Sequence, residues 1–137
     1  MDIFTRKVIG FRIDRSITAD GVIESLQTAI EEHGKPEIIR TDNGPEFISK
    51  TLDRFLFKER IKHEFIHKGK PYENGYIESF TDKFRNECLN LHLFRTIYEA
   101  KMIIRNYINY YNTERPHSAI GYETPIDFDK NLDTIQL

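Results

Sequence analysis

The sequence has little cysteine, no long apolar run and no secretion signal, and each shortage excludes a class of protein. Cys88 is the single cysteine, so no intramolecular disulfide can form, and beside five scattered His it shows no zinc-ligand spacing. No stretch approaches the roughly eighteen consecutive apolar residues of a membrane-spanning helix. The first residues, MDIFTRKV, lack the apolar segment of a secretion signal. These shortages predict a cytoplasmic protein without a membrane partner.

An excess of charge of one sign is also lacking. The chain has 20 Lys and Arg beside 22 Asp and Glu, for a formal net charge of −2. Because this balance creates no overall field that attracts nucleic acid, any DNA binding must come from local patches. The 137 residues, 39% of them hydrophobic, contain enough apolar material for one packed core, so composition predicts a single globular unit.

Strand and helix patterns alternate in the first half of the chain. Val8 to Ile13 alternates apolar and polar residues, which is the period of a half-buried strand. An amphipathic helix is predicted from Thr18 to about Gly34, and a short apolar strand from Glu37 to Thr41 follows it. That strand ends at the turn formers Asp42 to Pro45. The pattern therefore places Asp42 at the carboxyl end of a buried strand.

The second half of the chain continues this alternation. A helix around residues 52–56 precedes a short strand over 62–66, and the apolar side chains of 77–88 fall on one helical face. A capping box at 96–99 opens a further helix to about residue 112, and an irregular tail is expected beyond it. The β-α-β-α-β-α-α order predicts one α/β unit.

Two carboxylates are candidate metal ligands. Asp42 lies at a strand end, where open α/β sheets place ligand-binding groups. Glu78 lies near the start of the helix over 77–88, and Asp82 and Arg85 follow it on the same polar face. Mg²⁺ prefers carboxylate oxygens and needs few protein ligands, so a strand and a helix that bring Asp42 and Glu78 together could hold it. In isolation, however, Asp-Asn-Gly is more often a simple turn, and a helix-start Glu more often faces solvent.

Basic residues near these carboxylates are candidates for contact with phosphate. A basic loop precedes the helix over 77–88, and two cations lie on that helix. The candidate DNA-binding residues are Lys68, Lys70, Tyr72, Asn74, Lys83 and Arg85. Scattered Lys and Arg are more often solvated surface, so these residues alone decide nothing. Cys88 is predicted to be a small buried apolar residue. The tyrosines between residues 98 and 111 are predicted to pack in the core rather than to stack on bases.

Read together, four phrases resemble the insertion-sequence branch of the DDE transposases, which is related to retroviral integrases. The phrases are RTDNGPEF from Arg40, GKPYENGYIESF from Gly69, FRNECLN from Phe84, and YNTERPHS from Tyr111. Subtracting 42 from 78 gives 36, hence 35 residues between Asp42 and Glu78, which is the separation that this family keeps. The resemblance runs to about Phe128, so we expect a partial catalytic core over residues 1–128 and a tail over 129–137.

The resemblance implies a ribonuclease-H-like α/β fold, in which two Asp and one Glu hold Mg²⁺ or Mn²⁺ beside a mixed five-stranded sheet. It implies hydrolysis and strand transfer at DNA phosphodiesters in the bacterial cytoplasm, with transposon ends and target DNA as partners. Residue by residue, Asp42 corresponds to the second metal ligand and Glu78 to the third, both catalytic. Arg85 corresponds to a basic position near DNA phosphate.

The sequence departs from the family pattern at its amino end. The family's first Asp stands upstream of the phrase that MDIFTRKVIG resembles, so the first two strands and the first catalytic Asp are expected to be missing. An incomplete core of this kind is expected to be inactive alone and to bind metal weakly. Its unpaired strand edges predict self-association, or association with a full-length transposase. The alternative is a non-catalytic module that associates with a full-length transposase and modulates it.

Overall fold

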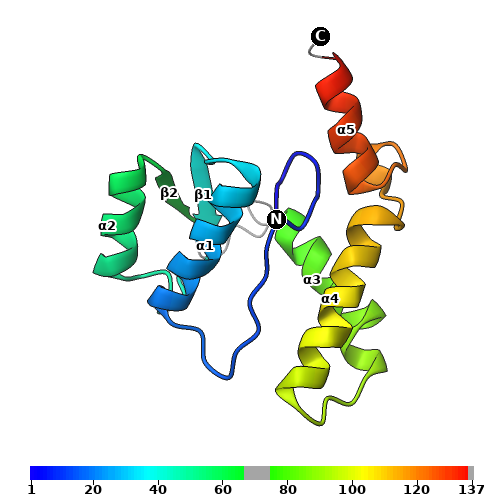
Figure 1. Cartoon of the computed structure of the whole chain (residues 1–137), viewed down its shortest axis with the longest axis horizontal. Coiled ribbons are helices and arrows are strands. Elements are labelled where there is room, and N and C mark those ends of the chain that lie inside the picture. The colour runs from blue at the N-terminus through cyan, green and yellow to red at the C-terminus, as the bar shows by residue number, and fades with distance from the viewer. Residues whose placement is uncertain (67–74, 136–137) are drawn as a thin grey trace. The chain divides into compact units, whose positions relative to one another are not determined.

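The computed structural model describes residues 1–66 and 75–135, and the chain forms two compact units (Figure 1). We call Gly10–Gly75 the strand unit, and Met1–Ile9 together with Tyr76–Leu137 the helical unit. The division falls inside the catalytic core expected over residues 1–128, whose boundaries stay a prediction.

The strand unit contains α1 (Ala19–His33), β1 (Ile38–Thr41), α2 (Lys50–Glu59) and β2 (Lys62–Phe65). α1 begins where the Thr18 side chain accepts a hydrogen bond from the Gly21 backbone N–H, and it ends at Gly34, whose φ of 88° suits glycine. β1 and β2 are parallel, with Ile38 paired to Lys62 and Thr41 to Phe65. The strand–helix–strand order predicted for this segment is therefore confirmed.

The core of the strand unit lies where its two helices meet the sheet. Leu52, Leu56 and Ile61 are buried there. Partly buried apolar side chains surround these three and come from α1, β1, α2 and the turn before α2. They are Val22, Ile23, Leu26, Ile30, Ile39, Phe47 and Phe55. Truncating Leu52 or Leu56 to alanine would cost about 2–5 kcal/mol of stability, because each is almost fully buried.

The strand predicted over Val8 to Ile13 is wrong: this segment forms no strand in the described chain. The reason is visible at Val8, whose backbone pairs with a side chain. The Val8 N–H donates to Asn112 Oδ1 and the Val8 carbonyl accepts from Asn112 Nδ2, both at 2.9 Å. Alternation of apolar and polar residues predicts which side chains face inward, but a strand also needs a neighbouring backbone to bond. At Val8 the Asn112 side chain takes the place of that backbone.

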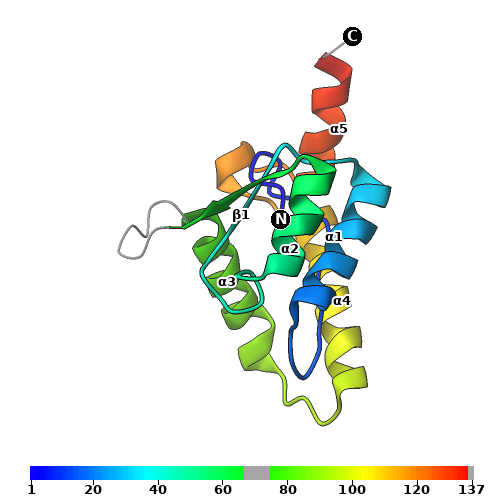
Figure 2. The ribbon, with the colours of Figure 1, turned by 90° about the vertical axis from the view of Figure 1, so that its left-hand side faces the viewer.

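The helical unit contains α3 (Gly75–Glu87), η2 (Leu89–Leu91), α4 (Ile97–Thr113), η3 (Ser118–Ile120) and α5 (Pro125–Ile135). α3 runs alongside α4 in both views (Figure 1 and Figure 2). Aromatic rings join the two helices, with ring centroids 5.1 Å apart between Phe80 and Tyr111 and 5.6 Å apart between Phe84 and Tyr107. The predicted apolar face of α3 is therefore the face that packs on α4.

Two predictions about side-chain burial in this unit have mixed outcomes. Cys88 is 1% exposed, which confirms its reading as a buried hydrophobe, and burial raises the pKa of its thiol. Tyr107 and Tyr111 are buried as predicted, whereas Tyr98 and Tyr110 are exposed. Packing thus accounts for only half of the tyrosines in this helix.

The tail expected beyond residue 112 is irregular only in part: residues 114–117 and 121–124 form no helix, whereas η3 and α5 are helical. Thr124 Oγ1 accepts a hydrogen bond from the Asp127 N–H at 3.2 Å, and Pro125 occupies the first position of α5. The amino-terminal segment packs on this helix through Phe4 and Phe128, whose ring centroids are 5.8 Å apart. Among the described residues, no helix is long and apolar enough to cross a membrane.

Candidate metal and DNA site

Asp42 follows β1 directly and is exposed, at the strand end where the sequence predicted it. Its Oδ1 accepts a hydrogen bond from the Gly44 N–H at 2.8 Å, which closes an Asx turn. Asn43 Nδ2 donates to the Ile66 carbonyl at 3.1 Å and ties the turn to the end of β2. A Cβ at Gly44 would lie 2.6 Å from Glu46 Oε1, so a side chain there would require the Glu46 carboxylate to move.

A second layer of contacts lies behind Asp42. Thr41 Oγ1 donates to the Asp42 carbonyl at 2.9 Å, and His63 Nε2 lies 2.8 Å from the same hydroxyl oxygen. Sequence analysis missed His63. The period of β2 places His63 on the same face as Ile61 and Phe65. This pattern favours burial of His63 but does not predict its contact with Thr41.

Glu78 lies in the first turn of α3 and is exposed. Arg85 and Asp82 follow it on this helix and form an exposed ion pair, with 3.5 Å between Arg85 Nη1 and Asp82 Oδ1. An exposed pair of this kind is weak, at about 0–1 kcal/mol, so Asp82 does not prevent Arg85 from exchanging to a phosphate oxygen. Lys83 is half-buried.

The end of α3 is fixed to α4 and to the segment after it by Glu87. Its carboxylate accepts hydrogen bonds from Tyr107 Oη at 2.9 Å, from Arg115 Nε at 2.9 Å and from Arg115 Nη2 at 2.6 Å. The hydrogen bonds from Arg115 lower the pKa of Glu87 most, against the opposing effect of burial. The contact between Glu87 and Arg115 could not be predicted from the sequence, because the two residues are 28 positions apart.

This anchor determines which way α3 presents Glu78. Glu78 precedes Glu87 by nine positions (87 − 78 = 9), which is two and a half turns at about 3.6 residues per turn. The two side chains therefore leave opposite sides of α3. At the start of the same helix, the Arg6 guanidinium lies 3.7 Å from the centroid of the Tyr76 ring. Sequence analysis missed this contact as well.

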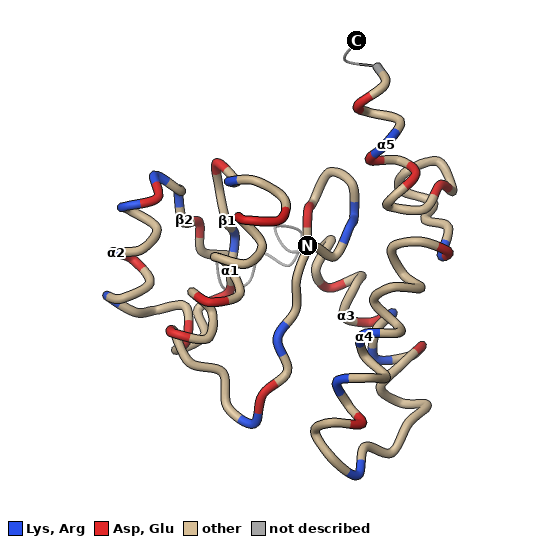
Figure 3. Tube along the Cα trace, in the orientation of Figure 1, with Lys and Arg blue, Asp and Glu red and all other residues tan. Residues whose placement is uncertain are grey.

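The structure places the predicted site residues in different parts of the chain. Asp42 belongs to the strand unit and Glu78 to the helical unit, so their convergence on one crevice stays a prediction. Lys68, Lys70, Tyr72 and Asn74 lie outside the described residues. Within 1–66 and 75–135, no group of three or more His, Cys, Asp or Glu could hold a metal ion. Lys and Arg are interspersed with Asp and Glu along the traces of both units (Figure 3).

Comparison with known families finds two models, both described as integrase core domain, which match residues 1–71 and 59–125. The chain is 41% identical over 128 residues to an uncharacterized 31.7 kDa protein of insertion element IS407 from Burkholderia multivorans, covering 93% of this chain and 46% of that protein. It is 35% identical over 134 residues to the transposase of insertion sequence IS904 from Lactococcus lactis, covering 95% and 53%. The chain thus spans about half the length of the curated relatives it matches.

Solved structures with a similar fold are retroviral integrase catalytic cores. The HTLV-2 core in complex with magnesium, in its trimeric form, has a TM-score of 0.61 and 25% identity, covering 92% of this chain and 78% of that one. The BIV core has a TM-score of 0.67 and 17% identity, covering 98% and 85%. These neighbours confirm the predicted ribonuclease-H-like fold class.

Proposed function

The chain belongs to the integrase core domain family, and from that premise we propose that it serves DNA transposition through metal-dependent hydrolysis and strand transfer at phosphodiesters. One observation carries the proposal. An exposed Asp follows a parallel strand directly, and 36 positions later (78 − 42) an exposed Glu opens a helix. Fold alone does not assign a function, so the argument rests on this pair and on the family.

Asp42 and Glu78 are the proposed ligands of a divalent cation, Mg²⁺ or Mn²⁺. Their donor chemistry fits such an ion, because hard cations prefer carboxylate oxygens and accept water or substrate phosphate in their other positions. When bound, the cation would activate an attacking oxygen and stabilise a leaving one. The chain's own contribution at Asp42 is orientation, since the Gly44 N–H holds Oδ1 and leaves Oδ2 to point elsewhere.

The DNA backbone is the proposed partner of the polar side of α3 and of the loop before it. Arg85 is exposed on this helix beside Asp82, at 3.5 Å, and would exchange that partner for a phosphate oxygen. Lys83 and the loop residues Lys68, Lys70, Tyr72 and Asn74 complete the proposed set. Contacts of this kind are salt-sensitive and carry little sequence information.

We further propose that these 137 residues do not cleave or join DNA by themselves. Two carboxylates supply too few ligands to align ions that three would hold in the intact family. A second candidate function is a module that associates with a full-length transposase. It is favoured by exposed apolar side chains where α3 leads into α4, among them Leu91 at 69%, Leu93 at 90% and Met102 at 63% exposure.

The shared metal site can be tested by titrating the chain with Mg²⁺ and following backbone amides by NMR. We expect the amides of Asp42 and Gly44 to shift with Mg²⁺, and Glu78→Gln to weaken that response. Glu99→Gln, on the other long helix of the same unit as Glu78, is the matched control. A response at Asp42 that Glu78→Gln leaves unchanged would remove Glu78 from the site.

The second candidate is tested by co-purification with a full-length relative. Capture of the chain by the IS904-type transposase, lost on Leu93→Glu, would support the modulating module. If the transposase does not capture the chain at any concentration, the modulating module is excluded and the strand-transfer proposal remains.

A further inference from the structure

His63 is a histidine with a mostly buried side chain that the proposed chemistry does not use. It lies on β2, its side chain is 9% exposed, and its ring is 4.1 Å from the Phe65 ring, centroid to centroid. Its Nδ1 is buried and has no hydrogen-bond partner within the described chain. A buried polar atom left unpaired costs free energy, and the imidazole makes its hydrogen bond through the other nitrogen.

The other nitrogen, Nε2, lies 2.8 Å from Thr41 Oγ1, and the second hydrogen bond of Thr41 bears on which atom carries the proton. A hydroxyl has one proton, and Thr41 donates it to the Asp42 carbonyl at 2.9 Å. In this arrangement Thr41 Oγ1 accepts from His63, which assigns the imidazole proton to Nε2. That tautomer leaves a bare lone pair on Nδ1, in agreement with the absence of a partner there.

The side chains that contact or face the His63 ring come from three elements. β1 supplies Thr41, β2 supplies Phe65, and α2 supplies Asp53, whose Oδ1 is 4.0 Å from Nδ1 and whose side chain is 64% exposed. At that distance Asp53 forms no hydrogen bond with the ring. The hydrogen bond to Thr41 is therefore the interaction that orients the imidazole.

We propose that His63 is a positioning residue for Asp42: through the Thr41 hydroxyl it fixes the backbone of the turn from which the Asp42 carboxylate projects. Three side chains then hold this turn against β2, with His63 and Thr41 on one side and Asn43, bonded to the Ile66 carbonyl at 3.1 Å, on the other. An exposed carboxylate at a strand end would otherwise sample many directions, and ordering it before a cation binds increases affinity. The inference rests on the proposed function, because it assigns a purpose to order at Asp42.

The test uses isosteric variants of the 137-residue chain. His63→Gln keeps an N–H near the Nε2 position, His63→Phe keeps the ring without a donor, and Thr41→Val removes the hydroxyl at constant shape. His33→Phe, on α1 of the same unit, is the matched control. Without metal, hydrogen exchange of the Gly44 amide reports the order of the turn, since this amide is bonded to Asp42 Oδ1.

We expect His63→Phe and Thr41→Val each to raise Gly44 exchange about fivefold, the loss of roughly one ordinary hydrogen bond. Combining them should add little, because both break the same chain of contacts. His63→Gln and His33→Phe should stay near the parent. Nitrogen shifts of the parent imidazole should show the proton on Nε2. A proton on Nδ1, or unchanged exchange in Thr41→Val, would overturn the proposal even if His63→Phe does not fold.

Magnesium then separates this inference from the proposed function. We expect the variants that loosen the turn to weaken Mg²⁺ binding, read at the Asp42 amide, by about threefold to tenfold, while His63→Gln restores it. If Mg²⁺ does not shift the Asp42 amide even in the parent, the metal site fails and the metal-free exchange results still decide the role of His63. If Mg²⁺ binds the parent and His63→Phe equally, His63 has no positioning role.

Discussion

Glu87→Gln removes the charge that anchors the end of α3, and its cost can be bounded from burial. The Glu87 carboxylate accepts from Tyr107 and twice from Arg115, whose side chain is 19% exposed against 34% for Glu87. Exposed ion pairs are worth about 0–1 kcal/mol, whereas breaking a fully buried pair costs about 3–5 kcal/mol. A pair of intermediate burial should lie between these limits. We expect Glu87→Gln to lower the free energy of unfolding by about 2 kcal/mol.

The matched control lies on the same helix. Asp82 forms an ion pair with Arg85 at 3.5 Å, with side-chain exposures of 70% and 57%, so Asp82→Asn should cost no more than about 0.5 kcal/mol. Urea unfolding followed by far-UV circular dichroism measures both, and the slope with urea should not change. Pairing Glu87→Gln with Arg115→Met in a double-mutant cycle isolates the coupling. A cost for Glu87→Gln no greater than that for Asp82→Asn would refute the anchoring role.

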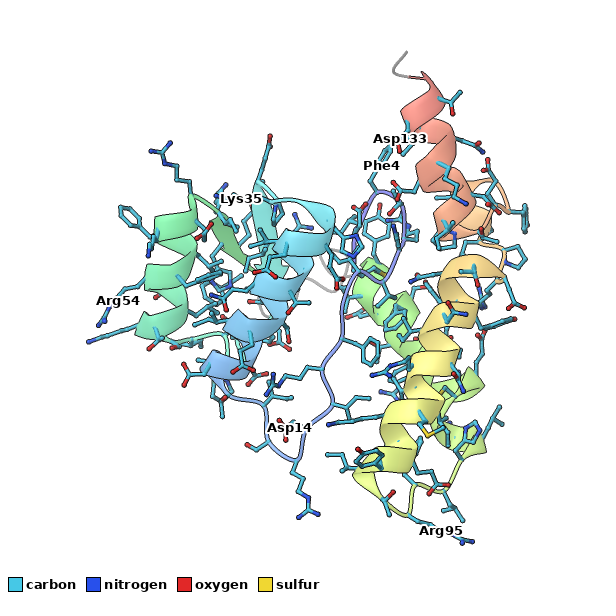
Figure 4. All side chains as sticks on the ribbon, viewed as in Figure 1. Phe4, Asp14, Lys35, Arg54, Arg95 and Asp133 are labelled. Carbon is cyan, nitrogen blue, oxygen red and sulfur yellow. The ribbon has the colours of Figure 1, made fainter. Side chains whose placement is uncertain are left out.

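Three further expectations concern DNA, assembly and pH. Arg85→Ala should weaken DNA binding at low salt in fluorescence anisotropy, whereas Arg95→Ala, exposed at the start of α4 (Figure 4), should bind like the parent; equal loss in both would remove Arg85 from the interface. The chain alone should leave plasmid DNA intact with Mg²⁺ or Mn²⁺ and should self-associate; nicking abolished by Glu78→Gln, or a monomer by light scattering at every concentration, would contradict these. Burial lowers the pKa of His117 from 6.5, so the unfolded chain takes up its proton first as pH falls. The stability that neutral His117 contributes is thus complete above pH 6.5 and lost below it. The urea midpoint should therefore decrease as the pH is lowered from 7.5 to 5.5, and it should decrease less in His117→Gln.

The helices of this chain could be predicted because their signals are local. Thr18 and Thr96 accept hydrogen bonds from the backbone three positions on, and apolar side chains at helical spacing determine the packed faces. The segment over residues 8–13 could not be predicted in the same way, since its state depends on Asn112, 104 positions away from Val8. α5 was not predicted because its start signal, Thr124 followed by Pro125, lies in the segment that was expected to be irregular.

The site shows the same division between local and distant signals. Asp42 was predicted at a strand end because turn formers follow it directly in the sequence. His63 and Glu87 were not assigned, since their partners depend on the register of β1 against β2 and on the packing of α3 against α4. Tyr107 illustrates the effect of such partners: burial, followed by its hydrogen bond to Glu87, raises the pKa of its phenol.

The Asn112 side chain bonds the backbone of Val8, so this contact does not depend on which side chain residue 8 carries. Asn112 bonds only the N–H and the carbonyl of residue 8, groups that almost every amino acid possesses. Substitutions at position 8 that fit the buried space should therefore be tolerated. At position 112, by contrast, aspartate would put a carboxylate oxygen against a carbonyl, and leucine would leave both peptide groups without partners. In related chains, position 112 should thus vary far less than position 8, although the two residues share the same contact.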